Sequence, residues 1–333
     1  MTDAKNKWVL VTGGTGFLAR HTILGLLARG HRVRASVRSA DKGAQLRAML
    51  AAAGGNVEGF QTVLADLMDA QAWPRAMDGV RHVMHLATPM QGDNVLAAAM
   101  EGTRNVLRAS AKAGVARVVL TSSGLAALHP ARKVGAGTAV TETDWTDPER
   151  RHIGEYARAK TLAERDAWRL AKELGLSLTT ILPGAILGPA LGPDRGGWLG
   201  MIGGMLSGQM KALPPIGLQM VDVRDVAELH INALFSPEAA GQRYIAAGEK
   251  LSLREVAEIL RQDLGAAARQ VGTREMPAWG LRLAGLVSPQ ARQAVPLLGP
   301  SPMLSAAKAE RELGWTPRPM RQSIGDTARS LLA

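Results

Sequence analysis

A tyrosine and a lysine four residues apart are the side chains in this sequence best suited to acid–base chemistry. Tyr156 and Lys160 lie in a stretch, 153–174, whose pattern predicts a helix, so both project from one helix face. A phenol titrates near pH 10, and a neighbouring ammonium favours its ionised form and lowers its pKa. The pair therefore suits transfer of a proton to a carbonyl oxygen that is receiving a hydride. An exposed tyrosine on an amphipathic helix is the competing interpretation.

Ser123 follows a predicted strand and adds a hydroxyl to this set. Ligands bind outside the carboxyl ends of parallel strands, where a hydroxyl can hold a substrate oxygen and steady Tyr156. Serines at strand ends are common, so this residue has meaning only together with the other two.

A glycine-rich turn near the start of the chain predicts a dinucleotide site. Small residues recur at Gly13, Gly16 and Ala19, directly between a predicted strand and a predicted helix. Glycines let the backbone turn tightly and approach a pyrophosphate, and the amino end of the helix then offers free N–H groups. A merely structural turn is the alternative. The residues predicted to contact the cofactor here are Gly13, Thr15, Gly16, Phe17 and Leu18.

The end of the second predicted strand indicates which dinucleotide binds. A carboxylate at this point holds a free 2′-hydroxyl of the adenosine ribose, whereas a cation holds a 2′-phosphate. The sequence has Arg38 there and Lys42 one helical turn further, so NADP(H) is favoured over NAD(H). A solvated surface arginine is the alternative. Asp66, after the third strand, can accept from the adenine amino group or cap the following helix.

The elements that must position these residues alternate strictly between strand and helix. Such alternation predicts a parallel sheet covered on both faces, a doubly wound α/β (Rossmann) fold, because crossovers between parallel strands are right-handed. The predicted strands are 8–11, 33–37, 57–64, 82–86, 118–120, 178–182 and 244–246, and the predicted helices are 17–29, 40–53 capped by Ser39, 69–77, 95–113 and 153–174.

The pattern changes after Pro183, where glycine and proline become frequent. We therefore predict a dinucleotide-binding domain over 1–182 with a returning segment at about 222–247. Residues 183–221 and 248–333 are predicted to form a smaller, mostly helical C-terminal lobe that binds substrate over the carboxyl edge of the sheet.

Composition excludes several classes of protein. The 333 residues carry 40 basic and 29 acidic side chains, a net charge of +11, and 46% of them are hydrophobic, which excludes a disordered chain. The absence of cysteine excludes a disulfide scaffold and a thiolate metal site, and we expect no metal. The basic residues are scattered without interleaved aromatics, so we expect no nucleic-acid partner. No secretory signal or long apolar run is present, so we expect a cytoplasmic protein without a membrane partner.

Together these motifs resemble the extended short-chain dehydrogenase/reductase family, within the NAD-dependent epimerase/dehydratase superfamily. The matching runs are 12–19, 66–67, 85–89, 121–123, 156–160 and 182–184, and the runs 33–38, 85–90 and 101–103 look like its dihydroflavonol reductase branch, of the bacterial aldehyde/ketone reductase type. The resemblance implies Ser123, Tyr156 and Lys160 as catalytic residues, with Lys160 also holding the nicotinamide ribose. It implies a capping role for Asp222. The further cofactor contacts that it implies are Leu67, Ala87, Thr88, Thr121, Pro183, Gly184 and Ile186.

Two departures from that family bear on the substrate. Plant flavonoid reductases carry an asparagine five positions after the catalytic serine, where this sequence has Leu128. The Cys-Tyr pair of cinnamoyl-CoA reductases is also missing. We therefore expect reversible NADPH-dependent reduction of small to medium hydrophobic aldehydes or ketones. The candidate substrate contacts are Met90, Leu125, Leu128, Trp198, Met201 and Met205, although the last three form an apolar helical stripe of the kind that usually packs in a core.

Two other functions use the same elements. An NAD-dependent sugar-nucleotide epimerase or dehydratase shares the fold and the catalytic residues, but such enzymes usually carry an acid where this sequence has Arg38. A non-catalytic dinucleotide sensor would not need Tyr156 or Lys160. The sequence leaves the substrate, the physiological direction and the choice between monomer and homodimer open.

Overall fold

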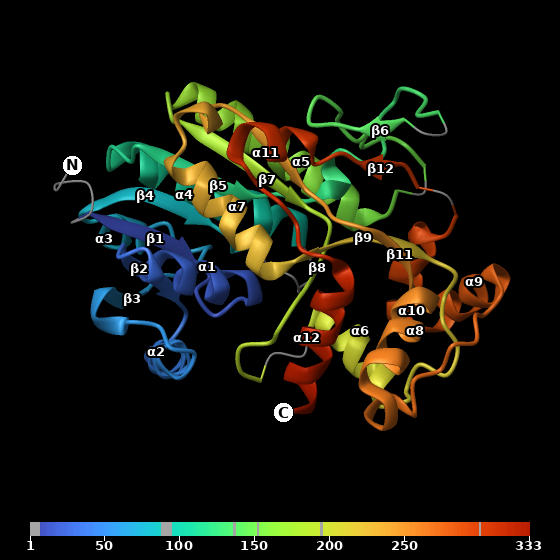
Figure 1. Ribbon diagram of the computed structural model, residues 1–333. Helices are drawn as coiled ribbons and strands as arrows, with labels where there is room; N and C mark the ends of the chain where they lie inside the picture. The colour runs from blue at the N-terminus through green and yellow to red at the C-terminus, as the bar shows by residue number, and fades with distance from the viewer. Residues whose placement is uncertain (1–6, 88–94, 136–137, 152, 194–195, 300) are drawn as a thin grey trace.

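A seven-stranded parallel sheet forms the centre of the protein (Figure 1). The computed structural model describes residues 7–87, 95–135, 138–151, 153–193, 196–299 and 301–333. In spatial order the strands are β10 (Arg243–Ala246), β7 (Leu178–Pro183), β5 (Arg117–Thr121), β4 (Val80–His85), β1 (Trp8–Thr12), β2 (Arg32–Val37) and β3 (Phe60–Leu64). Each neighbouring pair is parallel. The predicted doubly wound sheet is confirmed.

The strands are apolar on both sides because helices cover both faces of the sheet. In β1, Val9 and Val11 pack into one apolar cluster, while Leu10 between them packs into another on the opposite face. The helices on the first face are α1 (Phe17–Ala28), α2 (Ala40–Ala52), α7 (Val223–Phe235) and α11 (Ala307–Leu313). Those on the second face are α3 (Trp73–Ala76), α4 (Val95–Lys112) and α5 (Glu155–Glu173).

Local capping explains where two elements begin. The Ser39 side chain accepts a hydrogen bond from Lys42 N and caps α2, as predicted. The strand expected at 57–64 begins only at Phe60, because residues Val57–Gly59 form a short 3-10 turn. The Asn56 side chain accepts from Glu58 N and gives the backbone a local partner in place of a neighbouring strand.

The strand order reverses between β1 and β4. From β1 the chain continues to β2 and β3 on one side, and then crosses to β4 on the other side of β1. The connections after β1 and β4 therefore diverge, which opens a crevice at the carboxyl ends of these two strands. The glycine turn follows β1 directly, so the fold brings it to this crevice.

A smaller lobe lies beside the sheet, around its own apolar cluster (Figure 1). Its helices are α6 (Gly197–Leu206), α8 (Leu253–Leu264), α9 (Ala278–Val287), α10 (Pro289–Ala294) and α12 (Met320–Leu332). It also contains strands β8 (Ala185–Leu187), β9 (Gly217–Asp222) and β11 (Lys250–Ser252), which the sequence pattern did not predict. With three residues each, β8 and β11 show too few alternations to be recognised from sequence. The six residues of β9 begin with a glycine and end with an aspartate, both of which are depleted in strands. A separate pair joins β6 (Ala139–Val140) to β12 (Met303–Leu304).

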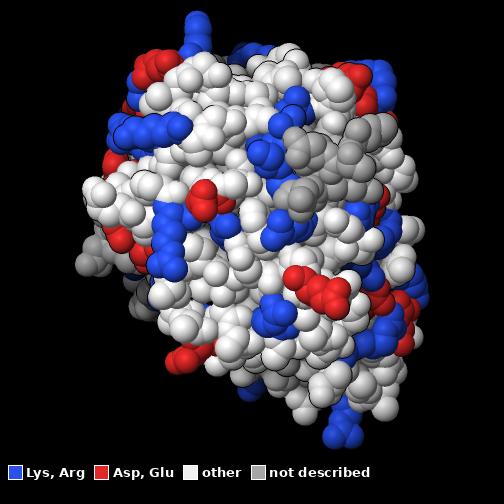
Figure 2. Space-filling model, turned by 90° about the vertical axis from the view of Figure 1, so that its left-hand side faces the viewer, with Lys and Arg blue, Asp and Glu red and all other residues white. Residues whose placement is uncertain are grey.

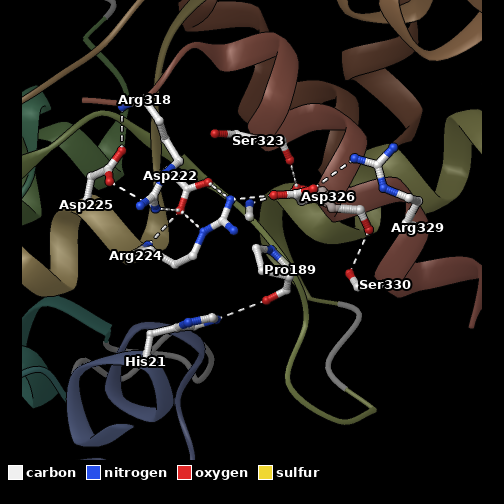
Figure 3. A network of polar contacts seen from close by, with 12 residues as sticks. His21, Pro189, Asp222, Arg224, Asp225, Arg318, Ser323, Asp326, Arg329 and Ser330 are labelled. Atoms are coloured by element: carbon white, nitrogen blue, oxygen red, sulfur yellow. Dashed lines mark hydrogen bonds and ion pairs between the residues drawn. The ribbon is translucent and has the colours of Figure 1, made fainter. Parts of the chain in front are cut away.

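A polar network joins the lobe to the large domain (Figure 3). The Asp222 carboxylate accepts from Arg224 N at 2.7 Å and caps α7, the role that the sequence resemblance implied. The Arg224 guanidinium also reaches Asp326 of α12, at 2.7 Å. On the other side, His21 Nε2 of α1 lies 3.0 Å from Pro189 O. The loop after β8 is thus fastened to the helix that follows the glycine turn.

Charge is dispersed over the face drawn in Figure 2, where Lys and Arg side chains form separate groups with uncharged surface between them. Within the described ranges, no helix is long and apolar enough to cross a membrane.

Candidate active site

The glycine turn forms a cradle that side chains would fill. Gly13 has a φ of 65°, and a Cβ there would lie 2.9 Å from Ala87 Cβ. A Cβ on Gly14 would lie 2.7 Å from Ala35 Cβ. Gly16 precedes α1 and offers no side-chain cap, so the first N–H groups of the helix are not taken up by a capping side chain. This backbone fits a pyrophosphate, and Thr15, Phe17 and Leu18 lie half-buried around it.

Thr12 holds the two diverging strand ends together. Its hydroxyl oxygen accepts from Leu86 N and Ala87 N, both at 3.1 Å, and lies 2.8 Å from His85 Nδ1. His85 Nε2 lies 3.1 Å from Thr103 Oγ1 of α4. Burial and the charge of Lys160 lower the pKa of His85 to about 3, so this histidine is neutral. Ala87 is consequently set against Gly13, and its contact with the cofactor stays a prediction.

Arg38 and Lys42 lie at the exposed end of β2 and in the first turn of α2. Gly13 N donates to Ser36 Oγ at 3.0 Å and Gly14 N donates to Ser36 O at 2.9 Å, which ties the glycine turn to the same strand end. Both cations therefore border the crevice at the side where an adenosine ribose is expected.

Asp66 and Leu67 form the turn after β3. The Asp66 carboxylate accepts from Met68 N at 2.9 Å. It does not cap the following helix, because α3 begins only at Trp73, so this alternative is wrong. Leu67 O accepts from Asn105 Nδ2 at 3.0 Å, which fastens the turn to α4. Asp66 is exposed, and its contact with the adenine amino group stays a prediction.

Tyr156 and Lys160 lie one turn apart at the amino end of α5. The helix begins after Gly154, whose φ of 80° is a conformation that glycine adopts without strain. Lys160 Nζ lies 5.9 Å from the centre of the Tyr156 ring. Tyr156 is 45% exposed, whereas Lys160 is only 9% exposed. The lysine therefore lies at the base of the site and the tyrosine at its surface.

The electrostatics of this pair differ from our expectation in one respect. Burial lowers the pKa of Lys160 to about 8, against the opposing effect of the Glu164 carboxylate, so the lysine is charged at neutral pH. The pKa of Tyr156 is raised by burial, although we expected the ammonium to lower it. Desolvation of the phenolate outweighs its attraction to an ammonium that lies 5.9 Å from the ring centre. Tyr156 is therefore protonated, which is the form that a proton donor needs.

The three residues that end β5 and follow it point to different neighbours. Thr121 Oγ1 lies 2.8 Å from His230 Nε2 of α7, so the hydroxyl of this predicted cofactor residue is already engaged within the protein. Ser122 is buried, and its hydroxyl donates to Glu164 at 2.6 Å. Ser123 is half-buried and caps a 3-10 turn by accepting from Leu125 N at 3.3 Å. Ser123 is the more exposed of the two serines, and its contact with substrate stays a prediction.

The segment after β7 also comes close to neighbouring backbone. Gly184 N donates to Ala246 O at 2.9 Å, and a Cβ on Gly184 would lie 2.4 Å from Gln219 O. Pro183 is buried at the end of β7, and Ile186 is half-buried in β8. Thr88 and Met90, predicted to contact cofactor and substrate, lie outside the described residues.

The apolar stripe on α6 divides between core and surface. Met205 has no exposed surface and packs inside the cluster of the lobe. Trp198 and Met201 are half-buried at the edge of that cluster. Leu125 and Leu128, which follow β5, are also half-buried, and Leu128 packs against a separate apolar cluster. We therefore retain Trp198, Met201, Leu125 and Leu128 as candidate substrate contacts, whereas Met205 supports the helix from within. Among the described side chains, no three His, Asp or Glu gather as metal ligands would.

Sequence reasoning assigned no role to Ser36 or Glu164. Ser36 accepts from Gly13, 23 residues away, and Glu164 accepts from Ser122 and Arg243, 42 and 79 residues away, so no local motif indicated these contacts. A charged residue four positions after Lys160 on a predicted helix was the one available signal for Glu164.

Comparison with known proteins agrees with this geometry. The model of the NAD dependent epimerase/dehydratase family matches residues 9–247. Cinnamoyl-CoA reductase 1 of Oryza sativa subsp. japonica is 35% identical over 264 residues, which cover 78% of this chain and 77% of that protein. Tetraketide alpha-pyrone reductase 1 of Arabidopsis thaliana is 36% identical over 270 residues, covering 78% and 82% of the two chains.

Among solved structures, the yeast methylglyoxal/isovaleraldehyde reductase Gre2, crystallised with NADPH, has the same fold. It superposes with a TM-score of 0.79 at 24% identity and covers 98% of both chains. The chain therefore belongs to the NAD-dependent epimerase/dehydratase family and is a reductase of its extended short-chain dehydrogenase/reductase type.

Proposed function

We propose that this protein is an NADPH-dependent reductase of small to medium hydrophobic aldehydes and ketones, reversible as an alcohol dehydrogenase. The observation that carries the proposal is the pair on α5: a protonated, half-exposed Tyr156 above a buried Lys160 that keeps its charge at neutral pH. A proton donor at the surface of a crevice, backed by a buried cation, is what reduction of a carbonyl requires.

NADPH, when bound, supplies the hydride that adds to the carbonyl carbon. Tyr156 donates its phenolic proton to the carbonyl oxygen, so that the C=O group becomes CH–OH and a phenolate remains. The Lys160 ammonium stabilises that phenolate and donates to the nicotinamide ribose, while the Ser123 hydroxyl orients the carbonyl oxygen. The phenolate regains a proton from solvent, to which Tyr156 is 45% exposed.

Three features support NADPH as the cofactor. The glycine cradle and the uncapped start of α1 suit a pyrophosphate. Arg38, at the end of β2, can hold a 2′-phosphate through two charge-assisted hydrogen bonds. The yeast reductase of the same fold was crystallised with NADPH.

Apolar side chains support a hydrophobic substrate. Leu125, Leu128, Trp198 and Met201 are half-buried and offer no hydrogen bonds from their aliphatic or ring carbons. A buried polyhydroxylated ligand would leave hydroxyls unpaired at about 1–3 kcal/mol each. An apolar carbonyl compound gains about 25 cal/mol for each Å² that it buries.

A substrate panel tests the proposal on a single preparation. Aryl aldehydes, alkyl ketones, a dihydroflavonol, cinnamoyl-CoA and a nucleotide sugar are compared by loss of 340-nm absorbance with NADPH and with NADH, and epimerisation is followed by chromatography. We expect the highest kcat/KM with apolar carbonyl compounds and NADPH. Turnover of the nucleotide sugar with tightly held NAD would establish an epimerase or dehydratase in place of this function.

A further inference from the structure

A third polar residue continues the row formed by Tyr156 and Lys160 along α5. Glu164 lies four residues after Lys160, so the three side chains follow one another at single-turn intervals on one helix face. Glu164 is only 2% exposed, and it faces the sheet. A carboxylate this deeply buried is costly unless its oxygens are paired.

Four side chains from separate elements satisfy the Glu164 carboxylate. Ser122 Oγ, after β5, donates to it at 2.6 Å, and Thr180 Oγ1 of β7 donates at 2.8 Å. Arg243 of β10 donates through Nε at 2.8 Å and Nη2 at 3.2 Å. Trp168 Nε1, one turn further along α5, lies at 3.3 Å. One carboxylate therefore fastens α5 to three adjacent strands of the sheet.

Arg243 is itself held in place on its far side. Its guanidinium lies 3.7 Å from the centre of the Trp145 ring, and Nη1 donates to Asp144 O at 2.8 Å. A buried ion pair of this kind contributes little net stability compared with well-packed apolar residues of the same size. Stability alone therefore does not explain the pair of Arg243 and Glu164. Its position next to Lys160 suggests a role in the active site.

Lys160 and Glu164 line the same small cavity. It has a volume of about 20 Å³ and lies between α4, α5 and the end of β5, with Thr103, Thr121 and Ser122 as its other polar lining residues. A cavity of this size holds about one water molecule. The lysine and the carboxylate are both buried at the wall of this space, where charges act more strongly on each other than in solvent.

We propose that Glu164 is a positioning residue for the catalytic groups: its negative charge keeps Lys160 protonated, and its bond to Ser122 fixes the backbone that carries Ser123. The proposal rests on the function proposed above, because it assigns Glu164 a role in the chemistry of Tyr156 and Lys160. It predicts that the charge of Glu164, and not merely its volume, determines the pH range of activity.

The charged and titratable groups around Lys160 support this assignment. Burial lowers the pKa of Lys160 to about 8, and Glu164 is the group that opposes this fall. From β4, the neighbouring His85 has a pKa lowered to about 3. From α7, His230 has a pKa lowered to about 4 and reaches the cavity only through Thr121. From β10, Arg243 is paired with Glu164. Glu164 is thus the carboxylate whose charge counteracts the effect of burial on Lys160.

The test compares Glu164→Gln with wild type across pH 5.5–9.5. Glutamine keeps the size and one of the two accepting oxygens, so that either Ser122 or Thr180 can still donate to it, but it removes the charge. Activity falls with rising pH as Lys160 loses its proton, and in Glu164→Gln we expect this descending limb to move to lower pH by about one unit or more. NADPH affinity, measured by nicotinamide fluorescence, is expected to weaken at the same lower pH.

Two variants separate charge from structure. Glu164→Asp keeps the charge and is expected to return the limb towards its wild-type position, even if kcat falls. Asp166→Asn is the matched control, because Asp166 lies on the same helix but pairs with Arg104 at 2.7 Å on the outer side. Its limb is expected to coincide with that of wild type. If activity falls at the same pH in Glu164→Asp as in Glu164→Gln, the negative charge at this position does not keep Lys160 protonated, and the proposal is overturned.

If Glu164→Gln does not fold, Glu164→Gln/Arg243→Met replaces the whole ion pair, and the limb is still expected at lower pH than in wild type. If the folded variant loses activity at the same pH as wild type and binds NADPH with the same affinity, the proposal is overturned. A wild-type protein that binds NADPH but reduces no carbonyl compound would instead refute the proposed function, while the pH dependence of NADPH binding would still decide the role of Glu164.

Discussion

Helices α5 and α6 each carry residues assigned to the active site, yet they are held in different ways. The 19 residues of α5 include no glycine, and its inner face is anchored by Glu164 and Lys160. The 10 residues of α6 include four glycines, and Gly196 before it provides no side-chain cap. Each glycine disfavours a helix by about 1 kcal/mol relative to alanine. Helix α6 therefore depends on packing through Leu199, Ile202 and Met205.

This difference places the catalytic groups and the candidate substrate contacts on helices that are stabilised in different ways. The proton donor is held on a helix whose own sequence and buried polar contacts favour one conformation. The candidate substrate wall, Trp198 and Met201, is held on a helix that only its neighbours stabilise. We expect changes near α5 to abolish turnover and changes near α6 to alter substrate preference.

The largest expected effect is a loss of stability at low pH, and we expect it to arise in the large domain. Burial lowers the pKa of His21 and His230 to about 4 and of His85 to about 3, whereas 183–221 and 248–333 contain no histidine. The unfolded chain binds these protons below about pH 6.5 and the native state does not. Stability should therefore fall with decreasing pH from about 6.5 to 4, and these three histidines together contribute about 4 kcal/mol per pH unit near pH 5.

Urea unfolding at pH 7.5, 6.0 and 5.0 measures this slope. His230→Gln should remove about one of the three protons from it. A pH-independent free energy of unfolding between 7.5 and 5.0 would contradict the assignment of these histidines as buried and neutral.

Tyr156→Phe should lower kcat by about 10² or more, because it keeps the ring and deletes only the proton donor. NADPH affinity should be unchanged, as measured by nicotinamide fluorescence. Lys160→Ala should damage both, because the lysine serves the tyrosine and the ribose. A fully active Tyr156→Phe protein would remove the proposed mechanism.

Arg38→Asp should weaken NADPH binding by about 10² while affecting NADH much less, because it removes a charge-assisted contact and adds repulsion to the 2′-phosphate. Arg81→Asp is the matched control: Arg81 is exposed near the opposite ends of the strands, in β4. Titration of both variants with each nucleotide measures the ratio. If wild type already prefers NADH, the assignment of Arg38 is wrong.

Gly184→Ala and Gly203→Ala compare a closely packed glycine after β7 with an unobstructed glycine of α6. At Gly184 a Cβ would lie 2.4 Å from Gln219 O, so we expect a loss of about 1–3 kcal/mol. At Gly203 of α6 a Cβ would meet nothing within 4 Å, so alanine should stabilise the helix by up to about 1 kcal/mol. Thermal unfolding compares the two variants, and equal shifts would show that backbone approach at Gly184 is unimportant.

Leu128→Asn should have the smallest effect. It supplies a polar group beside the end of β5, where Leu128 is half-buried. We expect kcat/KM for a dihydroflavonol to rise a few-fold and that for an aryl ketone to fall slightly, since one hydrogen bond is worth about 1 kcal/mol. Leu298→Asn, which alters a half-buried leucine of the lobe cluster, serves as the control. Identical kcat/KM ratios in Leu128→Asn and wild type would exclude Leu128 from the substrate site.

The sheet and the core of the site could be predicted from the sequence because their signals are local. Strands such as 8–11 are continuous apolar runs, and the turn at Gly13 and Gly16 lies between one of them and a helix. Tyr156 and Lys160 face the same way because a helix repeats every 3.6 residues. These features depend on neighbours within a few positions, so periodicity and residue type sufficed.

Tertiary structure alone decided the features that depend on distant partners. Strands β9 and β11 pair residues more than 30 positions apart along the chain. The burial of Met205, in contrast to Trp198 on the same stripe, follows from which side of α6 meets the lobe core. The raised pKa of Tyr156 reflects desolvation by surrounding segments. Glu164 meets Arg243 across 79 residues. Burial and long-range pairing arise only when segments far apart in the chain come together, and no local pattern encodes them.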